Sequence, residues 1–238
     1  MSNDPLLQPY QLKHLTLRNR IMTTSHEPAY PEDGMPKARY AAYHAERAKA
    51  GVALAMTAGS AAVSKDSPPV FNNILAYKDE VVPYIRQLTD ACHDHGCAVM
   101  IQLTHLGRRT TWNKGNWLPS VSSSKHREPA HRAFPKLAED WDIARIISDF
   151  ADATERMKDG GMDGIELQVY GHLLDQFHAL VEVAADLHDH GAVHHRLGQF
   201  AHGNLAFRDD HEGGDAGAGG VGRRRRGGVA GGRAHDRP

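Results

Sequence analysis

The chain has 238 residues, with 28 Lys and Arg against 29 Asp and Glu, and a formal net charge of −1. This length suffices for one domain with a sizeable core, and the balanced charge excludes a global field that would attract nucleic acid or a membrane surface. No apolar run approaches the ~18 residues of a membrane-spanning helix, and no signal peptide is expected. Because Cys92 and Cys97 do not make a disulfide framework, we expect a reducing, cytoplasmic location.

In chain order, apolar strand-like runs alternate with amphipathic helical patterns, which is typical of a parallel sheet covered by helices. The predicted elements are a hairpin strand at 12–17, strands at 19–24, 52–56, 98–101 and 162–169, and helices at 37–50, 79–95 and from the N-cap Asp140 to about Met157. The small residues 57–60 follow the second strand, where a flat ligand could approach the backbone closely.

The strand at 98–101 runs directly into a polar cluster. Gln102, Thr104, His105, Arg108 and Arg109 crowd its carboxyl end. In α/β folds ligands bind at that end of the strands, and an amide on a rigid strand suits a planar ligand with donors and acceptors along one edge. A strand end covered by solvated polar residues is the alternative, and His105 could equally be a buried structural residue.

The stretch 110–139 is long and irregular. Loops of this length in a compact domain are usually functional or disordered. We expect it to cover the ligand-binding end as a lid, with a solvated, mobile loop as the alternative.

Three segments carry a resemblance to a known family. The pattern Gln-Leu-x-His-x-Gly-Arg at 102–108 resembles the third barrel strand of the old yellow enzyme family of FMN oxidoreductases. Residues 19–21, Asn-Arg-Ile, resemble its first strand, and residues 160–167 resemble its fourth. The similarity runs from about Pro5 to Phe177. It implies an α/β fold, an FMN-type TIM (β/α)8 barrel, of which about the first four β/α units are present.

The resemblance also implies a cofactor and partners. FMN would lie across the barrel mouth, with NAD(P)H as electron donor or acceptor and a small molecule as substrate. Homo-oligomers are common in the family, whereas neither a membrane nor nucleic acid is an expected partner, and no metal site is predicted. The expected cofactor-binding residues are Gln102 at the pyrimidine edge, Thr24, Ser25 and His26 beside the ring, and Ala58 or Gly59 near its C4 carbonyl side.

The chain departs from the family at two places. Glu27 stands where old yellow enzymes have Thr or Cys; it would attract a cationic substrate, or it is a glutamate of a surface loop. Gln168 replaces the first His of an ene-reductase pair, with Tyr170 or His172 near the second. These four residues are the catalytic candidates. They favour the branch that resembles trimethylamine dehydrogenase and N-methyl amino acid demethylases, hence oxidative N-demethylation, or else reduction of an activated alkene.

Composition changes after Phe177. Residues 178–238 lack Lys, Ser, Thr and Ile, are rich in Ala, Gly, His and Arg, and include the run 223–226 of four arginines. We therefore predict two parts: an N-terminal half-barrel at 1–177 and a disordered tail at 178–238. A reading frame lost near codon 177 would explain the tail. The rival hypothesis is a genuine Arg- and Gly-rich tail that binds nucleic acid. The alternative to an enzyme is a truncated, non-catalytic fragment whose Arg-rich tail binds polyanions non-specifically. Because the resemblance implies that the phosphate-binding loops lie beyond this point, we expect the chain as written to bind FMN weakly or not at all and to be unstable alone.

Overall fold

The computed structural model describes residues 3–67, 70–110, 118–128, 130, 133–177 and 205–206. All of them belong to one compact unit, Met1–Arg208. The predicted disordered tail lies outside the described residues except at 205–206, and so does the part of the predicted lid at 111–117. The predictions for those segments stay predictions.

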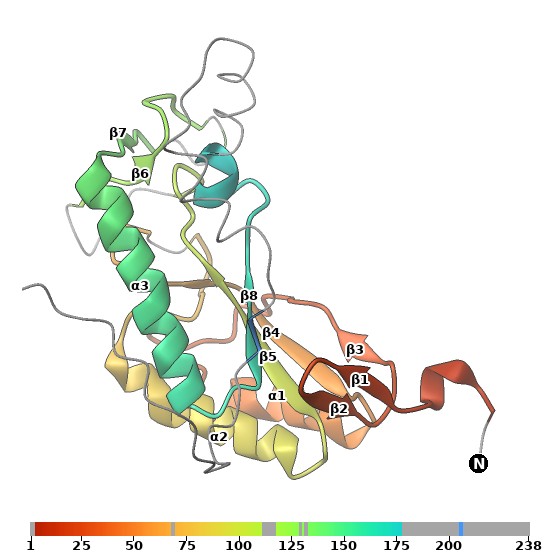
Figure 1. Ribbon diagram of the computed structural model, residues 1–238. Coiled ribbons are helices and arrows are strands. Elements are labelled where there is room, and N and C mark those ends of the chain that lie inside the picture. The colour runs from red at the N-terminus through yellow and green to blue at the C-terminus, as the bar shows by residue number, and fades with distance from the viewer. Residues whose placement is uncertain are drawn as a thin grey trace, which may run out of the picture. The chain divides into compact units, whose positions relative to one another are not determined.

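A five-stranded sheet with strand order β3-β4-β5-β8-β9 forms the centre of the fold (Figure 1). Its strands are β3 (Met22–Thr23), β4 (Leu54–Ala62), β5 (Ala98–Thr104), β8 (Gly164–Leu167) and β9 (Leu205–Ala206). The first four strands pair in parallel and in chain order, as the first four strands of a (β/α)8 barrel do. β9 pairs antiparallel with β8, unlike the next strand of such a barrel.

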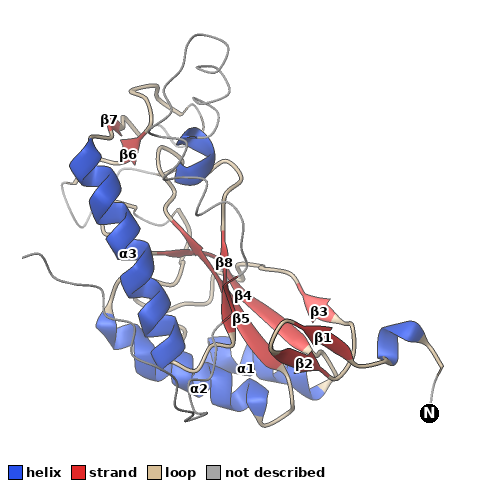
Figure 2. Ribbon diagram, in the orientation of Figure 1, coloured by secondary structure: helices blue, strands red, loops and turns tan. Residues whose placement is uncertain are grey.

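Three helices follow the first three parallel strands and pack on one side of the sheet (Figure 2). They are α1 (Ala38–Lys49), α2 (Val82–His93), which extends a 3-10 turn η2 (Asp79–Val81), and α3 (Asp140–Asp159). Their predicted positions are confirmed, but the N-cap of α3 is Glu139 rather than Asp140. Glu139 has extended backbone angles, and its amide donates to Asp142 Oδ2 at 2.9 Å, so the helical turn closes one residue earlier than predicted.

Alternate residues of the strands face opposite sides, which separates the core from the candidate site. On β5, Val99, Ile101 and Leu103 join the large core beneath the helices. Met100, on the other face, joins a smaller core with Leu17 of the hairpin. Gln102 and Thr104 therefore share the Met100 face, inside the curve of the sheet.

The hairpin β1 (Tyr10–Leu12) and β2 (Leu15–Leu17) packs against the amino ends of the parallel strands. The next predicted strand, 19–24, is reduced to the two residues of β3. Asn19 Nδ2 donates to Gly51 O at 2.8 Å, and Arg18 donates to Ala48 O and Val52 O. These side chains hold the start of the segment on the end of α1, so its backbone joins the sheet only from Met22.

The predicted irregular stretch 110–139 contains a small two-stranded parallel sheet, β6 (Val121–Ser122) with β7 (Lys136–Leu137). Ser122 Oγ donates to Gln176 Oε1 at 2.9 Å, which ties this sheet to a helical segment at 173–177. In the part of the chain that the structure describes, no helix has both the length and the apolar character needed to cross a bilayer.

Candidate functional site

The carboxyl ends of the parallel strands bring together side chains that are far apart in the sequence. Gln102 on β5 and Glu166 on β8 occupy partner positions in the parallel ladder. The segment 24–27 follows β3, and the small residues 58–60 lie within β4. We call this set of residues, together with Gln168, the strand-end site.

Gln102 connects three strands at the strand-end site. Its amide nitrogen Nε2 donates to Ser25 Oγ at 2.8 Å and to Glu166 Oε2 at 3.2 Å. A carboxylate only accepts hydrogen bonds, so Glu166 fixes which side of the amide carries the NH₂ group. The buried side chain, 6% exposed, is thereby left with its carbonyl oxygen Oε1 as an acceptor for a ligand.

The backbone of β4 is irregular where it borders the site. Its register with β5 shifts between Thr57 and Ala61, and both Ala58 and Ser60 have positive φ, 50° and 93°. The predicted strand end at Met56 is therefore wrong: β4 continues through this bulge to Ala62 because pairing with β5 resumes there. Non-glycine residues in this region of φ are strained, and such strain occurs often at binding sites.

The bulge lies directly against the segment that follows β3. A Cβ atom added to Gly59 would be 2.9 Å from Ser25 O and 3.0 Å from Glu27 N. Thr24 and His26 are exposed, whereas Ser25 is half-buried. The residues predicted to flank a flat ligand therefore form one continuous surface of backbone and small side chains.

Glu27 has an unusual environment for a carboxyl group. Its Oε1 accepts from the amide of Ala29 at 2.8 Å, while its Oε2 is buried and has no hydrogen-bond partner among the described residues. Burial raises the pKa of Glu27 to about 7, although the bond from Ala29 acts in the opposite direction. Glu27 is thus half-buried rather than a solvated loop residue, and it can bind or release a proton near neutral pH.

The three catalytic candidates after β8 do not converge. Gln168 is half-buried, and Tyr170 is 81% exposed. His172 is 8% exposed and its Nδ1 lies 2.5 Å from Thr104 Oγ1. Burial, together with Arg109 and His105, lowers the pKa of His172 to about 4, so its ring is neutral at pH 7. Among these three, Gln168 is the one closest in sequence to Glu166 and the strand-end site.

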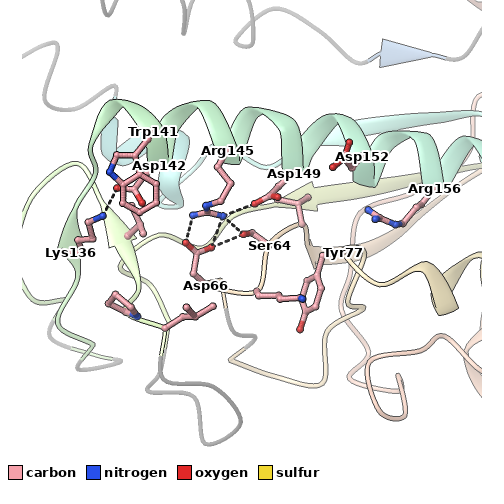
Figure 3. Close-up of a pocket in the computed structure, with 15 residues that line it drawn as sticks. Ser64, Asp66, Tyr77, Lys136, Trp141, Asp142, Arg145, Asp149, Asp152 and Arg156 are labelled. Atoms are coloured by element: carbon pink, nitrogen blue, oxygen red, sulfur yellow. Dashed lines mark hydrogen bonds and ion pairs between the residues drawn. The ribbon is translucent and has the colours of Figure 1, made fainter.

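The structure resolves the ambiguity over His105. Its Nδ1 accepts from the amide of Gly107 at 3.1 Å, so Nε2 carries the proton that it donates to Asp66 Oδ1 at 3.0 Å. Arg145 of α3 also pairs with Asp66, as well as with Asp149 (Figure 3). His105 therefore belongs to a buried ionic network under α3.

Three residues of this network, Asp66, Arg145 and Asp149, line a cavity of about 500 Å³ between α3 and the loop after β4 (Figure 3). Trp141, Tyr77 and Lys136 also line it, and none of the predicted cofactor-binding or catalytic residues does. Nowhere in the described ranges do three or more His, Cys, Asp or Glu side chains gather in a way that could hold a metal ion.

Glu166 is a site residue that sequence reasoning missed. It lies within the fourth-strand segment that carries the family resemblance, at a position that alternates with the core residue Ile165. That alternation alone could have placed it on the same face as Gln168. Only the β5–β8 register pairs it with Gln102.

Comparison with known proteins places these features in a family. The sequence pattern of the NADH:flavin oxidoreductase / NADH oxidase family matches residues 5–185. Over 74% of its length the chain is similar to morphinone reductase, with a TM-score of 0.67, 22% sequence identity and coverage of 51% of that chain. At this identity the likeness shows the fold: a (β/α)8 barrel, of which β3, β4, β5 and β8 correspond to the first four strands.

Several other relatives are more similar in sequence. The chain is 76% identical over 177 residues to a probable N-methylproline demethylase of Rhizobium meliloti (strain 1021). It is 50% identical to a multifunctional alkene reductase/demethylase of Caballeronia cordobensis, and 43% identical to an N,N-dimethylglycine/sarcosine dehydrogenase of Chromohalobacter salexigens. Each match covers 74% of this chain but 26% of the relative, so the chain spans about a quarter of their length.

Proposed function

The chain belongs to the NADH:flavin oxidoreductase / NADH oxidase family of FMN-dependent enzymes, and we propose that its strand-end site is the flavin-ring side of an FMN site that serves oxidative N-demethylation. The substrate would be an N-methylated amine or amino acid, and NAD(P)H could serve as electron donor or acceptor. Reduction of an activated alkene is the second candidate, because one relative is named for both activities.

The observation that carries this proposal is the fixed amide of Gln102. With both amide protons bonded to Ser25 and Glu166, its Oε1 faces a ligand as an acceptor, which suits the N–H group on the pyrimidine edge of a flavin. The bulge at 58–60 and the segment 24–26 offer a surface of small residues on which a flat ring could lie. The residues present therefore fit the ring part of FMN.

Bound FMN would supply two-electron redox chemistry, in which a hydride is accepted from a carbon next to nitrogen or delivered to an alkene. The residues of this chain would bind the substrate and handle its proton. The carboxylate of Glu27 attracts a cationic ammonium group, and with a pKa of about 7 it can accept that proton near neutral pH.

Gln168 complements this assignment. An amide can donate a hydrogen bond but carries no positive charge, so it stabilises a developing anion less than a histidine pair would. This favours an amine substrate over an enone. The names of two relatives, a demethylase and a dimethylglycine/sarcosine dehydrogenase, support the same substrate class.

Glu27→Gln tests the proposal. In the FMN-loaded chain, we expect N-methylproline to perturb the flavin absorption spectrum, with an affinity that rises as the pH passes through about 7. Glu27→Gln should weaken this affinity about tenfold and remove the pH dependence, because the variant cannot become anionic. Glu155→Gln, at an exposed position of α3, is the matched control.

Two results would contradict the proposal. One is a wild-type chain that shows no change in flavin absorption or fluorescence when it is titrated against FMN. The other is FMN-loaded protein that reduces cyclohexenone but gives no spectral response to N-methylated amines.

A further inference from the structure

Two buried side chains hydrogen-bond to the strained bulge of β4. Asn73 Nδ2 donates to Gly59 O at 3.4 Å and to Ser60 O at 3.1 Å, and the Tyr40 hydroxyl accepts from Ala58. Ala58 is fully buried and has a φ of 50°, a backbone conformation that residues with a Cβ rarely adopt. Its amide donates to the hydroxyl oxygen of Tyr40 at 2.9 Å. Since Ala58 is 0% exposed, water cannot replace this acceptor.

The side chain of Tyr40 is buried and tightly packed, so its hydroxyl has a fixed position. Tyr40 lies on α1, 18 residues before Ala58, and its side chain is fully buried. Its ring packs on the ring of His44 with centroids 5.1 Å apart. Burial, and next the carboxyl group of Glu27, raise the pKa of the Tyr40 hydroxyl, so it stays neutral across the working pH range.

Gly59 couples the position of the Ala58 peptide to the strand-end site. Gly59, the next residue, is wedged against Ser25 O and Glu27 N, where even a methyl group would approach to 2.9 and 3.0 Å. A shift of the Ala58 peptide would therefore displace the segment that carries Ser25, the hydrogen-bond partner of Gln102.

We propose that Tyr40 is a positioning residue, which holds the Ala58 peptide in the strained conformation that the flavin-facing surface needs, while Asn73 binds the carbonyl groups of Gly59 and Ser60. It acts through Ala58 and does not itself touch the ligand. The role of Tyr40 in flavin binding rests on the proposed function, whereas its effect on the backbone at Ala58 does not.

Tyr40→Phe removes the hydroxyl and keeps the ring. Tyr43→Phe is the matched control: Tyr43 lies on the same helix, its ring packs edge-on against Tyr30, and no hydrogen bond of its hydroxyl is recorded within the described part of the chain. Site-resolved amide exchange of the flavin-free chain is the first measurement. In Tyr40→Phe, the Ala58 amide should exchange at least tenfold faster relative to the Val99 amide of β5, with no such change in Tyr43→Phe.

Titration with FMN is the second measurement. Tyr40→Phe should weaken FMN binding about tenfold, and adding Ala58→Gly should recover most of the loss, because glycine adopts this φ without strain. Rescue of this kind is not expected if the hydroxyl of Tyr40 merely stabilises the core, because Ala58→Gly restores no lost hydrogen bond.

The outcomes separate the two hypotheses. Equal acceleration of the Ala58 and Val99 amides, or no acceleration at Ala58, would overturn the positioning role whether or not FMN binds. No binding of FMN by the wild-type chain would instead overturn the proposed function, while the exchange data would still decide the role of Tyr40.

Discussion

Gln102 and Glu166 face each other across the β5–β8 ladder, with Gln102 Nε2 3.2 Å from Glu166 Oε2. The carboxylate orients the amide: it accepts a hydrogen bond from Nε2, so the carbonyl oxygen of Gln102 points away from Glu166. A side-chain amide that could rotate would offer either a donor or an acceptor. Under the proposed function, Glu166 would therefore decide which edge of a ligand the strand-end site recognises.

Removal of this orienting group should weaken flavin binding. We expect Glu166→Ala to raise the Kd for FMN at least tenfold, because a hydrogen bond to a charged acceptor contributes about 1.5–3 kcal/mol. Glu166→Gln should lose less, since its carbonyl oxygen can still accept. Fluorescence titration with FMN measures both. Unchanged affinity in Glu166→Ala would mean that Ser25 alone holds the amide.

His44 is predicted to make the fold sensitive to acid. It is 2% exposed, and neither ring nitrogen has a hydrogen-bond partner in the described structure. Burial, followed by the charges of Arg47 and His26, lowers its pKa from 6.5 to about 4. In the unfolded chain this residue is protonated below about pH 6.5, whereas in the folded chain it is protonated only below about pH 4. The free energy of unfolding therefore falls as the pH drops from 6.5 to 4.

His44→Phe should remove this contribution. At pH 7 the variant should be about 1 kcal/mol more stable, because it buries no unpaired N–H group, and this gain should grow by about 2–3 kcal/mol between pH 7 and pH 4.5. Urea unfolding at several pH values measures it, with the exposed His95→Phe as control. Part of the acid sensitivity should remain, because the pKa of His172 is lowered in the same direction. An unaltered pH slope in His44→Phe would contradict the prediction.

Asp66 should stabilise the protein at neutral pH. Burial alone would raise its pKa, but hydrogen bonds from His105 and Ser64 and the charge of Arg145 outweigh it and hold the pKa well below its usual range. Its contribution is therefore present above the ordinary carboxyl pKa of about 4 and is lost as the pH falls below that value.

Asp66→Asn tests this contribution. The variant leaves Arg145 without its buried partner and should lower the free energy of unfolding at pH 7 by about 2–3 kcal/mol, less than for a fully buried pair because Arg145 is partly exposed. Asp152→Asn, at an exposed position of the same helix α3, should change it little. The difference between wild type and Asp66→Asn should shrink below about pH 4. A difference that is constant with pH would exclude an ionic origin.

Local signals in the sequence placed the helices well. The apolar faces and the glycines at the ends of α1, α2 and α3 are short-range features, and the predicted boundaries lie close to the observed ones. The predicted boundaries of the strands were less accurate. β3 is shortened by side chains that bind the end of α1, and β4 is extended by a ladder that resumes after a bulge. Both corrections arise from partners more than 30 residues away, which no local pattern contains.

The sequence by itself determined the family, the parallel order of the first four strands and the nature of the residue at the end of β5, an amide at Gln102. Tertiary structure alone decided how these groups act. It buried Glu27 enough to raise its pKa to about 7, turned His172 toward Thr104, and set Glu166 beside Gln102. Strand order follows from motifs that are contiguous in the chain. Burial and cross-strand pairing depend on segments that meet only when the sheet has formed.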